Sequence, residues 1–384
     1  MKKKLIFIIN NFFPAFIFPI KKNKIVVDSF RGNTFSGNGK YVTLELLKYS
    51  KNIDIVWLDK LGKMNSDKYP KNVRVVKYNS LSALYELATA RVWIDDFRKK
   101  YMPRKKANQV YFQLWHGSIA LKKIERDILD KLPEDYIKEA IRDGAYSDFM
   151  VSGSTFMTNL YKKSFWFSGD ILEFGTPSLD SLKKNNNDEV NKIFSLKDEN
   201  ILLYAPTFRN SENKDIYNIP FLEIIRHLEN SLGGNWKCII KLHPNDQEFE
   251  KRLVDGGKII SGSTCSDIQM IINRSNLIIT DYSSVMFDAI LNNKKVLLYT
   301  PDYENYLNNE RGFYFKFSEL PFPQALNLTD LYSVIDSFDN DKYFENIKIF
   351  DSKIGRMENG NASYRTAKYI VEKIINLEGN SEKK

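Results

Sequence analysis

Residues 277–291 decide the fold class, and they read LIITDYSSVMFDAIL. The apolar and β-branched run at 277–280 predicts a buried strand, and the apolar spacing from Ser284 onward predicts a helix over 284–291. A polar turn from Asp281 to Ser284 joins the two elements. Because a strand that passes through a short turn into a helix is half of a βαβ unit, this stretch predicts a parallel sheet covered by helices.

The same alternation runs through most of the chain. Strands are predicted at 24–27, 53–58, 73–77, 91–94, 110–115, 149–151 and 171–174, and again at 201–204, 237–241, 277–280 and 296–299. Helices are predicted at 40–49, 82–90, 221–231, 266–272, 284–291, 329–338 and 362–375. The sequence therefore predicts an α/β protein.

The length of 384 residues suggests two domains of ordinary size. Residues 181–199 are rich in Lys, Asn, Asp and Glu and are the best candidate linker, with a surface helix as the alternative. We expect a first Rossmann-like domain at 24–185, a second at 186–360, and a closing helix and tail at 361–384.

The N-terminal residues 1–23 resemble a signal peptide, because three lysines precede an apolar run. Two asparagines and two prolines interrupt that run, no small-residue cleavage site follows, and it falls short of the roughly 20 residues that span a membrane. Two alternatives remain: an interfacial segment that rests on an anionic membrane, or an ordinary first helix packed on the domain.

The composition excludes several classes of protein. A hydrophobic content of 43% and an aromatic content of 14% argue against disorder. The net charge of +9 favours anionic partners such as nucleotide phosphates, an acidic membrane surface or a polyanionic polymer. The chain contains no zinc-finger or RNP-type motif, so we expect no nucleic acid partner. The only cysteines, Cys238 and Cys265, are typical of a cytosolic protein, and zinc spacing is absent.

Polar residues, and one glycine beside them, follow five predicted strands, at the ends where doubly wound sheets bind ligands. They are His116, Gly117 and Ser118 after 110–115, Thr207 and Arg209 after 201–204, His243 after 237–241, Asp281, Ser283 and Ser284 after 277–280, and Asp302 after 296–299. The third histidine, His227, lies in a predicted helix and is expected to be structural. Five polar strand ends together predict a binding or catalytic site.

The turn from Asp281 to Ser284 has two interpretations. Its backbone N–H groups and the helix dipole favour a diphosphate, with Asp281 or Ser283 as N-cap; plain helix capping is the alternative. Arg311 could bind phosphate through its planar guanidinium or be an ordinary solvated arginine.

Other patterns are weaker. Gly39-Lys40 resembles the end of a P-loop, but the first glycine and the Ser/Thr of that motif are missing. Asp339-Asn340-Asp341 has the spacing of a metal-binding motif, and we interpret it as a surface turn. The absence of a Gly-x-Ser-x-Gly elbow argues against a serine hydrolase.

Taken in order, these segments resemble the CDP-glycerol glycerophosphotransferase family, the primases and polymerases of teichoic acid and capsule polymers. The matching motifs are SGNGKY at 36–41, QLWHGS at 113–118, LKKI at 121–124, LYAPTFR at 203–209, KLHP at 241–244, TDYSSVMFD at 280–288, RGFYF at 311–315 and NGNAS at 359–363. Two departures affect the acceptor loop: Ser118 stands where threonine is common, and Glu125 where glycine is frequent.

The resemblance implies a GT-B-type fold in which two Rossmann-like domains face each other across a cleft, the first on the acceptor side and the second binding the nucleotide. An acceptor hydroxyl would attack the glycerol-linked phosphorus of CDP-glycerol, and CMP would leave. His116 is the expected general base, because imidazole titrates near neutral pH, and His243 is expected opposite it beside the diphosphate.

The resemblance also implies roles for the neighbouring side chains. Diphosphate or nucleotide binding is expected of Arg311, Ser283, Ser284, Asp281, Thr207, Arg209 and Asp288, and acceptor binding of Gly117, Ser118, Lys122 and Lys123. Asp288 would either touch the glycerol or brace its helix.

The implied partners are CDP-glycerol or a related CDP-polyol as donor, and a lipid-linked saccharide or growing polymer as acceptor, at the cytoplasmic face of the bacterial membrane. Basic clusters at 98–100 and 104–106 would hold the enzyme on anionic lipid or be solvated loops. No cofactor is required, while Mg²⁺ bridging the diphosphate stays open. The rival hypotheses are a CDP-ribitol-dependent transferase, a GT-B enzyme using a nucleotide sugar, and a non-catalytic membrane module that binds polyanions.

Overall fold

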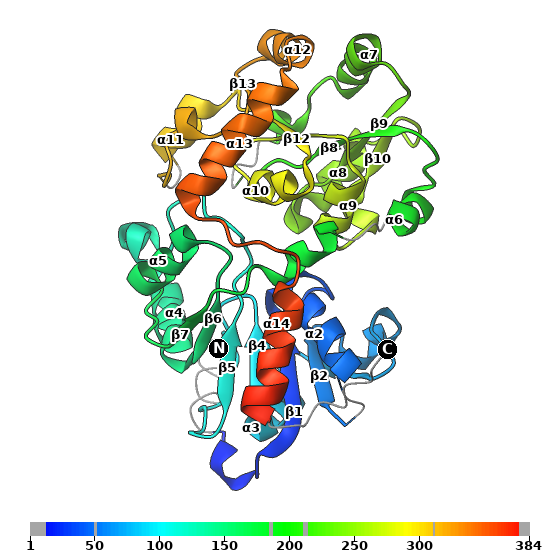
Figure 1. Cartoon of the computed structure of the whole chain (residues 1–384). Helices are drawn as coiled ribbons and strands as arrows, with labels where there is room; N and C mark the ends of the chain where they lie inside the picture. The colour runs from blue at the N-terminus through cyan, green and yellow to red at the C-terminus, as the bar shows by residue number, and fades with distance from the viewer. Residues whose placement is uncertain (1–12, 50–51, 184–186, 210–213, 310–311, 376–384) are drawn as a thin grey trace. The chain divides into compact units, whose positions relative to one another are not determined.

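The computed structural model describes residues 13–49, 52–183, 187–209, 214–309 and 312–375 (Figure 1). The described residues form two compact units. Unit 1 contains residues 13–117, 125–180 and 357–375, and unit 2 contains residues 118–124 and 181–356, apart from the gaps.

Unit 1 is built on a parallel sheet with the strand order β3-β2-β1-β4-β5-β6-β7. Its strands are β1 Lys21–Asp28, β2 Asp54–Asp59, β3 Val73–Lys77, β4 Ala90–Asp95, β5 Val110–Gln113, β6 Phe149–Val151 and β7 Asp170–Leu172. Its helices are α2 Gly37–Tyr49, α3 Leu81–Thr89, α4 Glu134–Tyr146, α5 Thr155–Ser164 and α14 Ala362–Tyr369, which continues as the π-helical turn η11 Ile370–Ile375. Short 3₁₀ segments are η1 Ala15–Ile17, η2 Phe30–Gly32, η3 Gly62–Lys68, η4 Glu125–Lys131 and η5 Pro177–Lys183.

Both faces of this sheet are buried, which explains why its central strands are apolar runs rather than alternating patterns. Val27 and Trp57 pack with Ile370 on one face, and Val26 packs with Trp93 on the other. Neighbouring residues of β1 therefore enter different cores, as the alternation of a strand requires.

Unit 2 repeats the arrangement with the parallel strand order β10-β9-β8-β11-β12-β13. Its strands are β8 Asn200–Tyr204, β9 Trp236–Ile240, β10 Ile259–Ser261, β11 Leu277–Thr280, β12 Lys295–Tyr299 and β13 Gln324–Ala325. Its helices are α6 Asn187–Phe194, α7 Phe221–Leu232, α8 Gln247–Leu253, α9 Ile268–Arg274, α10 Val285–Ala289, α11 Tyr303–Asn309, α12 Leu328–Asp336 and α13 Asn340–Ile354. The 3₁₀ segments are η6 Asp215–Tyr217, η7 Pro244–Asp246, η8 Gly262–Thr264, η9 Ile290–Asn292 and η10 Phe317–Glu319.

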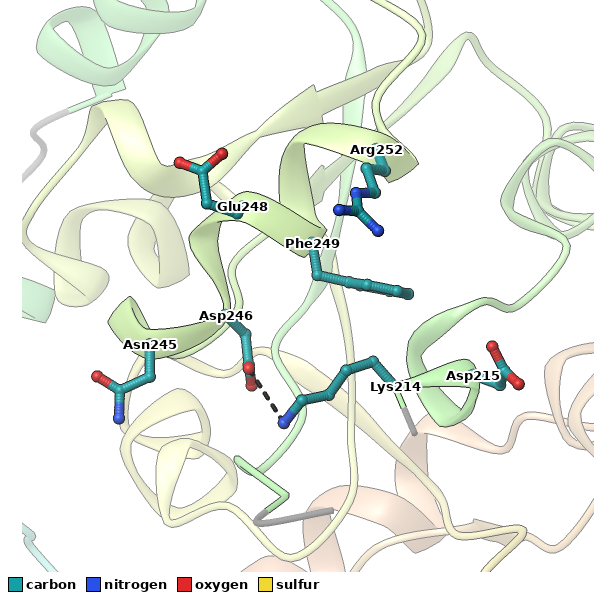
Figure 2. A pocket seen from close by; sticks show the side chains of 7 residues that line it. All are labelled: Lys214, Asp215, Asn245, Asp246, Glu248, Phe249 and Arg252. Carbon is teal, nitrogen blue, oxygen red and sulfur yellow. Dashed lines mark ion pairs between the residues drawn. The ribbon is translucent and has the colours of Figure 1, made fainter. Parts of the chain in front are cut away.

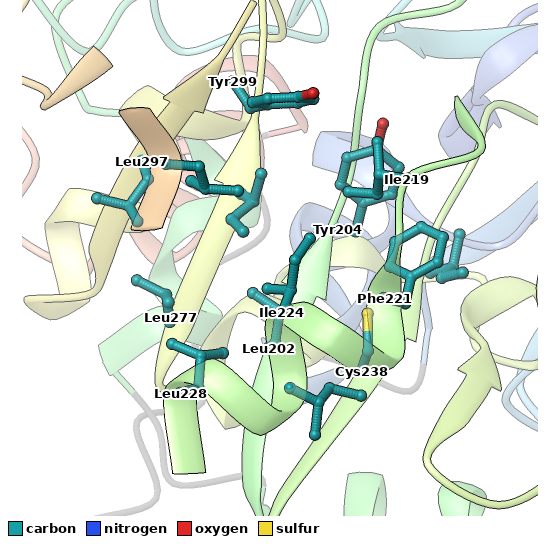
Figure 3. Close-up of a cluster of buried hydrophobic side chains, with 14 of the residues drawn as sticks. Leu202, Tyr204, Ile219, Phe221, Ile224, Leu228, Cys238, Leu277, Leu297 and Tyr299 are labelled. Atoms are coloured by element: carbon teal, nitrogen blue, oxygen red, sulfur yellow. The ribbon is translucent and has the colours of Figure 1, made fainter. Parts of the chain in front are cut away.

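The core of unit 2 lies between its sheet and α7 (Figure 3). Ile224 and Leu228 of the helix pack against Leu202 and Leu277 of the strands. Cys238 lies in the same core as a free thiol, as expected from its apolar neighbours, and burial raises its pKa.

The two units differ from the expected domains in several segments. Residues 13–23 and 357–360 belong to unit 1, and residues 181–183 belong to unit 2. Residues 118–124 belong to unit 2, because backbone bonds join them to the segment around Phe313. The closing helix α14 belongs to unit 1, where it lies against α2 (Figure 1), and Ala367 and Val371 enter the core.

Two local details differ from the sequence interpretation. Asp339-Asn340-Asp341 is structural, as expected, but it forms the start of α13 rather than a surface turn, because the Asp339 carboxylate accepts the backbone N–H of Lys342 at 3.0 Å as an N-cap. The basic cluster at 98–100 is not a lipid-facing loop. Arg98 and Lys99 are each only 1% exposed and pair with buried carboxylates.

Most of the N-terminal segment, residues 1–12, lies outside the described residues. Between residues 13 and 23 the helical structure is confined to η1, where Phe16 and Ile17 are 83% and 60% exposed. No helix within the described part of the chain is long and apolar enough to cross a membrane.

Candidate active site

His116 follows β5 on a turn with an unusual backbone. Trp115, the residue before it, has a φ of +54°, in the left-handed region that costs a non-glycine residue about 1–3 kcal/mol. The Gln113 side-chain oxygen accepts the Trp115 N–H at 2.9 Å, and the Arg98 guanidinium lies 5.6 Å from the buried indole. Side chains from several elements thus hold a conformation that the isolated turn would avoid.

The His116 ring is fixed by one hydrogen bond and by aromatic neighbours. Its Nδ1 lies 3.0 Å from the backbone carbonyl oxygen of Asp96, and its centroid lies 4.6 Å from that of Phe97. A carbonyl oxygen can only accept, so Nδ1 carries the proton. In the neutral imidazole, Nε2 is then the nitrogen with the lone pair that a general base needs.

Asp96 fills the N-terminus of α2, the position of the P-loop-like Gly39-Lys40. Its buried carboxylate accepts from the Ser29 hydroxyl at 2.7 Å, from the Phe30 N–H at 3.1 Å and from the Gly39 N–H at 3.4 Å. Burial raises the pKa of Asp96 to about 7 despite these donors. The Asp96 carboxyl group therefore joins the Ser29–Phe30 turn to the start of α2.

Sequence reasoning missed Asp96 as a site residue. The available signal was the same one that found the others, because Asp95 ends β4 and Asp96 follows it directly.

In unit 2, His243 follows β9 and begins η7. Its Nδ1 accepts the Asn245 N–H at 3.2 Å, so the neutral ring carries its proton on Nε2, and its ring centroid lies 4.9 Å from that of Phe208. Burial lowers the pKa of His243, and Lys214 adds to this while Asp246 opposes it. His243 therefore presents a neutral N–H donor at pH 7.

The ends of β8, β11 and β12 meet in one ion-pair network. The Arg209 guanidinium donates to Asp281 at 2.8 Å and to Asp302 at 3.0 Å, and it lies over the rings of Tyr282 and Tyr306. The neighbouring charges raise the pKa of Arg209 above its ordinary value. Since the Arg209 guanidinium pairs with carboxylates that follow β11 and β12, it braces the turns at these strand ends. Its role as a nucleotide ligand stays a prediction.

Asp281 also fixes the backbone of two neighbouring turns. Asp281 does not cap α10; its other oxygen accepts the N–H of Thr207 at 2.7 Å and the N–H of Tyr282 at 2.5 Å. The buried hydroxyl of Thr207 has no hydrogen-bond partner within the described parts of the chain.

Ser283 and Ser284 lie half-buried at the start of α10, a helix of only five residues. Two of the first backbone N–H groups, of Met286 and Phe287, bond to the carbonyls of Ser283 and Ser284 at 3.3 and 3.0 Å. These two N–H groups are therefore engaged within the turn itself, and the diphosphate site at this turn stays a prediction.

Asp288 braces its surroundings. Its carboxylate accepts from the Ser118 hydroxyl at 2.5 Å and from the Gln269 amide at 2.8 Å, and burial raises its pKa. Of the expected acceptor-side residues, Gly117 ends a segment of unit 1, while Ser118, Lys122 and Lys123 lie in unit 2. Arg311 lies outside the described residues.

Lys122 and Lys123 are tied to unit 2 through their backbones. Lys122 forms an antiparallel bridge with Phe313, and the Lys123 N–H donates to the Gly312 carbonyl at 2.7 Å. The ammonium of Lys122 lies 5.4 Å from the Tyr306 ring centroid.

A cavity of about 380 Å³ opens in unit 2 beside η7 (Figure 2). Its lining residues are Lys214, Asp215, Asn245, Asp246, Glu248, Phe249 and Arg252. The Lys214 ammonium pairs with Asp246 at 3.1 Å across it. Within the described ranges, no group of three or more His, Cys, Asp or Glu residues could hold a metal ion.

Known proteins resemble this chain over nearly its whole length. A family model described as CDP-glycerol:poly(glycerophosphate) glycerophosphotransferase matches residues 11–372. A teichoic acid poly(glycerol phosphate) polymerase of Bacillus spizizenii is 30% identical over 381 residues, covering 94% of this chain and 93% of the relative. The polymerase of the same name from Staphylococcus epidermidis is 28% identical over 371 residues, covering 90% of this chain but 50% of the relative, so the chain spans about half of that longer protein.

Among solved structures, the wall teichoic acid polymerase TagF is 27% identical with a TM-score of 0.80, covering 92% of this chain and 90% of that chain. A TagF variant soaked with CDPG matches with the same coverage and a TM-score of 0.78. Together with the two doubly wound sheets, these matches show that the chain belongs to the CDP-glycerol:poly(glycerophosphate) glycerophosphotransferase family and is a transferase with a GT-B-type fold of two Rossmann-like units.

Proposed function

We propose that this enzyme transfers glycerol phosphate from CDP-glycerol to a hydroxyl of a growing teichoic-acid-type polymer and releases CMP. The family match and the likeness to TagF support the donor and the polymer. The observation that carries the mechanism is the contact between His116 Nδ1 and the Asp96 carbonyl, because it makes Nε2 the proton acceptor at the end of β5.

In the proposed step, the acceptor hydroxyl oxygen forms a bond to the glycerol-linked phosphorus. The bond between that phosphorus and the bridging oxygen of CMP breaks, and its electron pair stays on CMP. His116 Nε2 takes the hydroxyl proton. A positioned base of this kind contributes roughly 10²–10⁴-fold to the rate.

The leaving CMP needs donors for its developing negative charge. We assign this role to the Nε2–H of His243, with Ser283 and Ser284 holding phosphate oxygens and Arg311 contributing charge. The lowered pKa of His243 supports a neutral hydrogen-bond donor rather than a second cation.

We further propose that the acceptor is a lipid-linked saccharide or polymer at the cytoplasmic face of the membrane. The exposed side chains of Phe16 and Ile17, close in sequence to the exposed Lys21 and Lys22, support an interfacial contact with anionic lipid. The net charge of +9 acts in the same direction.

The test is a donor screen with the purified chain and a lipid-linked saccharide acceptor in vesicles of anionic and of neutral lipid. CDP-glycerol, CDP-ribitol and UDP-sugars are compared by released nucleotide, with and without EDTA. We expect CMP release with CDP-glycerol, faster on anionic vesicles, and its loss in His116→Asn with donor binding retained. Turnover only with CDP-ribitol or a UDP-sugar would replace the proposed donor, and no turnover with any donor would favour a non-catalytic module.

A further inference from the structure

Asn38, at the start of α2, connects three separate chain segments. It is 2% exposed. Its side-chain amide donates to the carbonyls of Leu114 at 3.2 Å and Trp115 at 2.8 Å, and its oxygen accepts the Ser178 N–H at 2.9 Å. A buried amide with this many backbone contacts has little freedom to move.

Two of these contacts fall on the turn that carries His116. The Leu114 N–H still bonds to the Asp95 carbonyl at 2.7 Å, but the chain leaves the sheet there and Trp115 turns to a φ of +54°. The Leu114 and Trp115 carbonyls then need donors from elsewhere, and Asn38 supplies them.

The imidazole is held by the same end of α2. His116 Nδ1 bonds to the carbonyl of Asp96, and the carboxylate of Asp96 accepts the N–H of Gly39, the neighbour of Asn38. The backbone before His116 and the acceptor of its ring are therefore both attached to the first residues of one helix.

We infer that Asn38 is a positioning residue for His116: its amide keeps Trp115 in the left-handed conformation that places Nδ1 on the Asp96 carbonyl, which leaves Nε2 as the unprotonated nitrogen. The effect of Asn38 on kcat rests on the proposed function, whereas its effect on the tautomer of His116 does not. Asn38 does not touch substrate in this account and acts through the turn.

The test uses the full chain labelled with ¹⁵N-histidine. The sequence has three histidines, so long-range ¹⁵N–¹H spectra give three imidazole patterns, assigned by His116→Gln and His243→Gln. We expect His116 with its proton on Nδ1 and His243 with its proton on Nε2. A wild-type His116 protonated on Nε2 would overturn the inference.

Asn38→Asp removes the amide N–H donors and places a carboxylate oxygen next to the carbonyl oxygens of Leu114 and Trp115. We expect His116 to populate both tautomers and kcat to fall about 10²-fold, the loss typical of a misplacement of about 1 Å, with the donor KM within about twofold. Thr43→Val is the control, because this α2 hydroxyl is buried without a partner in the described chain; it should leave tautomer and kcat unchanged.

Asn38→Ala serves as a second variant if Asn38→Asp does not fold. A folded Asn38 variant with an unchanged His116 tautomer, or with kcat within threefold of wild type, overturns the inference. If the wild type shows the expected tautomer and the variants alter it, but no donor is turned over, the positioning stands and the proposed function fails.

Discussion

Replacing Arg209 with methionine tests the network that organises the ends of β8, β11 and β12. The side chains of Arg209, Asp281 and Asp302 are 9%, 5% and 17% exposed, so all three charges are largely removed from water. Methionine keeps an unbranched but shorter side chain and removes every N–H donor. Asp281 and Asp302 are then left buried without the cation that compensates them.

The magnitude follows from this geometry. Removing one partner of a buried ion pair costs about 3–5 kcal/mol, because the remaining charge keeps its desolvation penalty. At about 1.4 kcal/mol per tenfold, that is a rise of roughly 150- to 4,000-fold in the opening equilibrium of unit 2. A domain stable by about 10 kcal/mol, the middle of the usual range of about 5–15 kcal/mol, would stay folded but open much more often.

Amide hydrogen exchange read by mass spectrometry is the appropriate assay, because it separates the two units. We expect faster exchange in β8, β11 and β12 of Arg209→Met and unchanged exchange in β1 and β4. Arg252→Met, at an exposed position of the same unit, is the matched control and should exchange like wild type. If the free energy of opening of β8, β11 and β12 in Arg209→Met falls by less than about 1 kcal/mol, this network does not brace the site.

Three further predictions concern single side chains. Burial lowers the pKa of His243, so its NMR titration midpoint should lie below 6.5, and a midpoint at or above 6.5 would contradict this. The free energy of unfolding that depends on the neutral ring is then fully present above pH 6.5 and is lost as the pH falls through the pKa of the folded state. Ser118→Ala removes a donor from Asp288 and should cost about 1–3 kcal/mol in urea unfolding, while Ser118→Thr keeps the bond; equal stability of both variants would argue against it. Asp180 accepts the N–H groups of Ala362 at 3.0 Å and Ser363 at 2.7 Å at the start of α14, as an N-cap side chain does. Asp180→Ala should therefore lower the free energy of unfolding by about 0.5–2 kcal/mol and speed amide exchange in α14, and unchanged exchange there would argue against this capping role.

The sheets could be predicted from sequence because most of their strands are short runs rich in apolar and β-branched residues. Val73–Lys77, Phe149–Val151 and Leu277–Thr280 appear in the structure with the predicted bounds. Ile259–Ser261 and Gln324–Ala325, the edge strands of unit 2, were missed because they contain only two and one apolar residues, whereas all three residues of Phe149–Val151 are apolar.

Helix α4 was not predicted, although Glu134 and Asp135 in its first turn are signals for the start of a helix. Its buried residues include Ala140, Asp143 and Gly144 rather than large apolar side chains. Gly144 is required by close packing, since a Cβ there would lie 2.4 Å from the carbonyl oxygen of Trp166. Only the tertiary structure reveals that contact.

The positions of two candidate site residues were predictable from the topology alone. His116 and His243 follow parallel strands, so the rule that ligands bind at carboxyl ends selects them. The contacts of Asn38 and Arg209 could not be read in the same way, because their partners lie more than 70 residues away in the sequence. The sequence did not reveal that the Arg209 guanidinium contacts the carboxylates of Asp281 and Asp302.

The most direct test of the central claim is a ³¹P NMR time course of the enzyme with CDP-glycerol and a lipid-linked acceptor. We expect a new phosphodiester signal and CMP to grow in equal amounts, and we expect His116→Asn to bind the donor yet form neither. A His116→Asn enzyme that makes phosphodiester at the wild-type rate, or a wild type that consumes CDP-glycerol without making any, would contradict it.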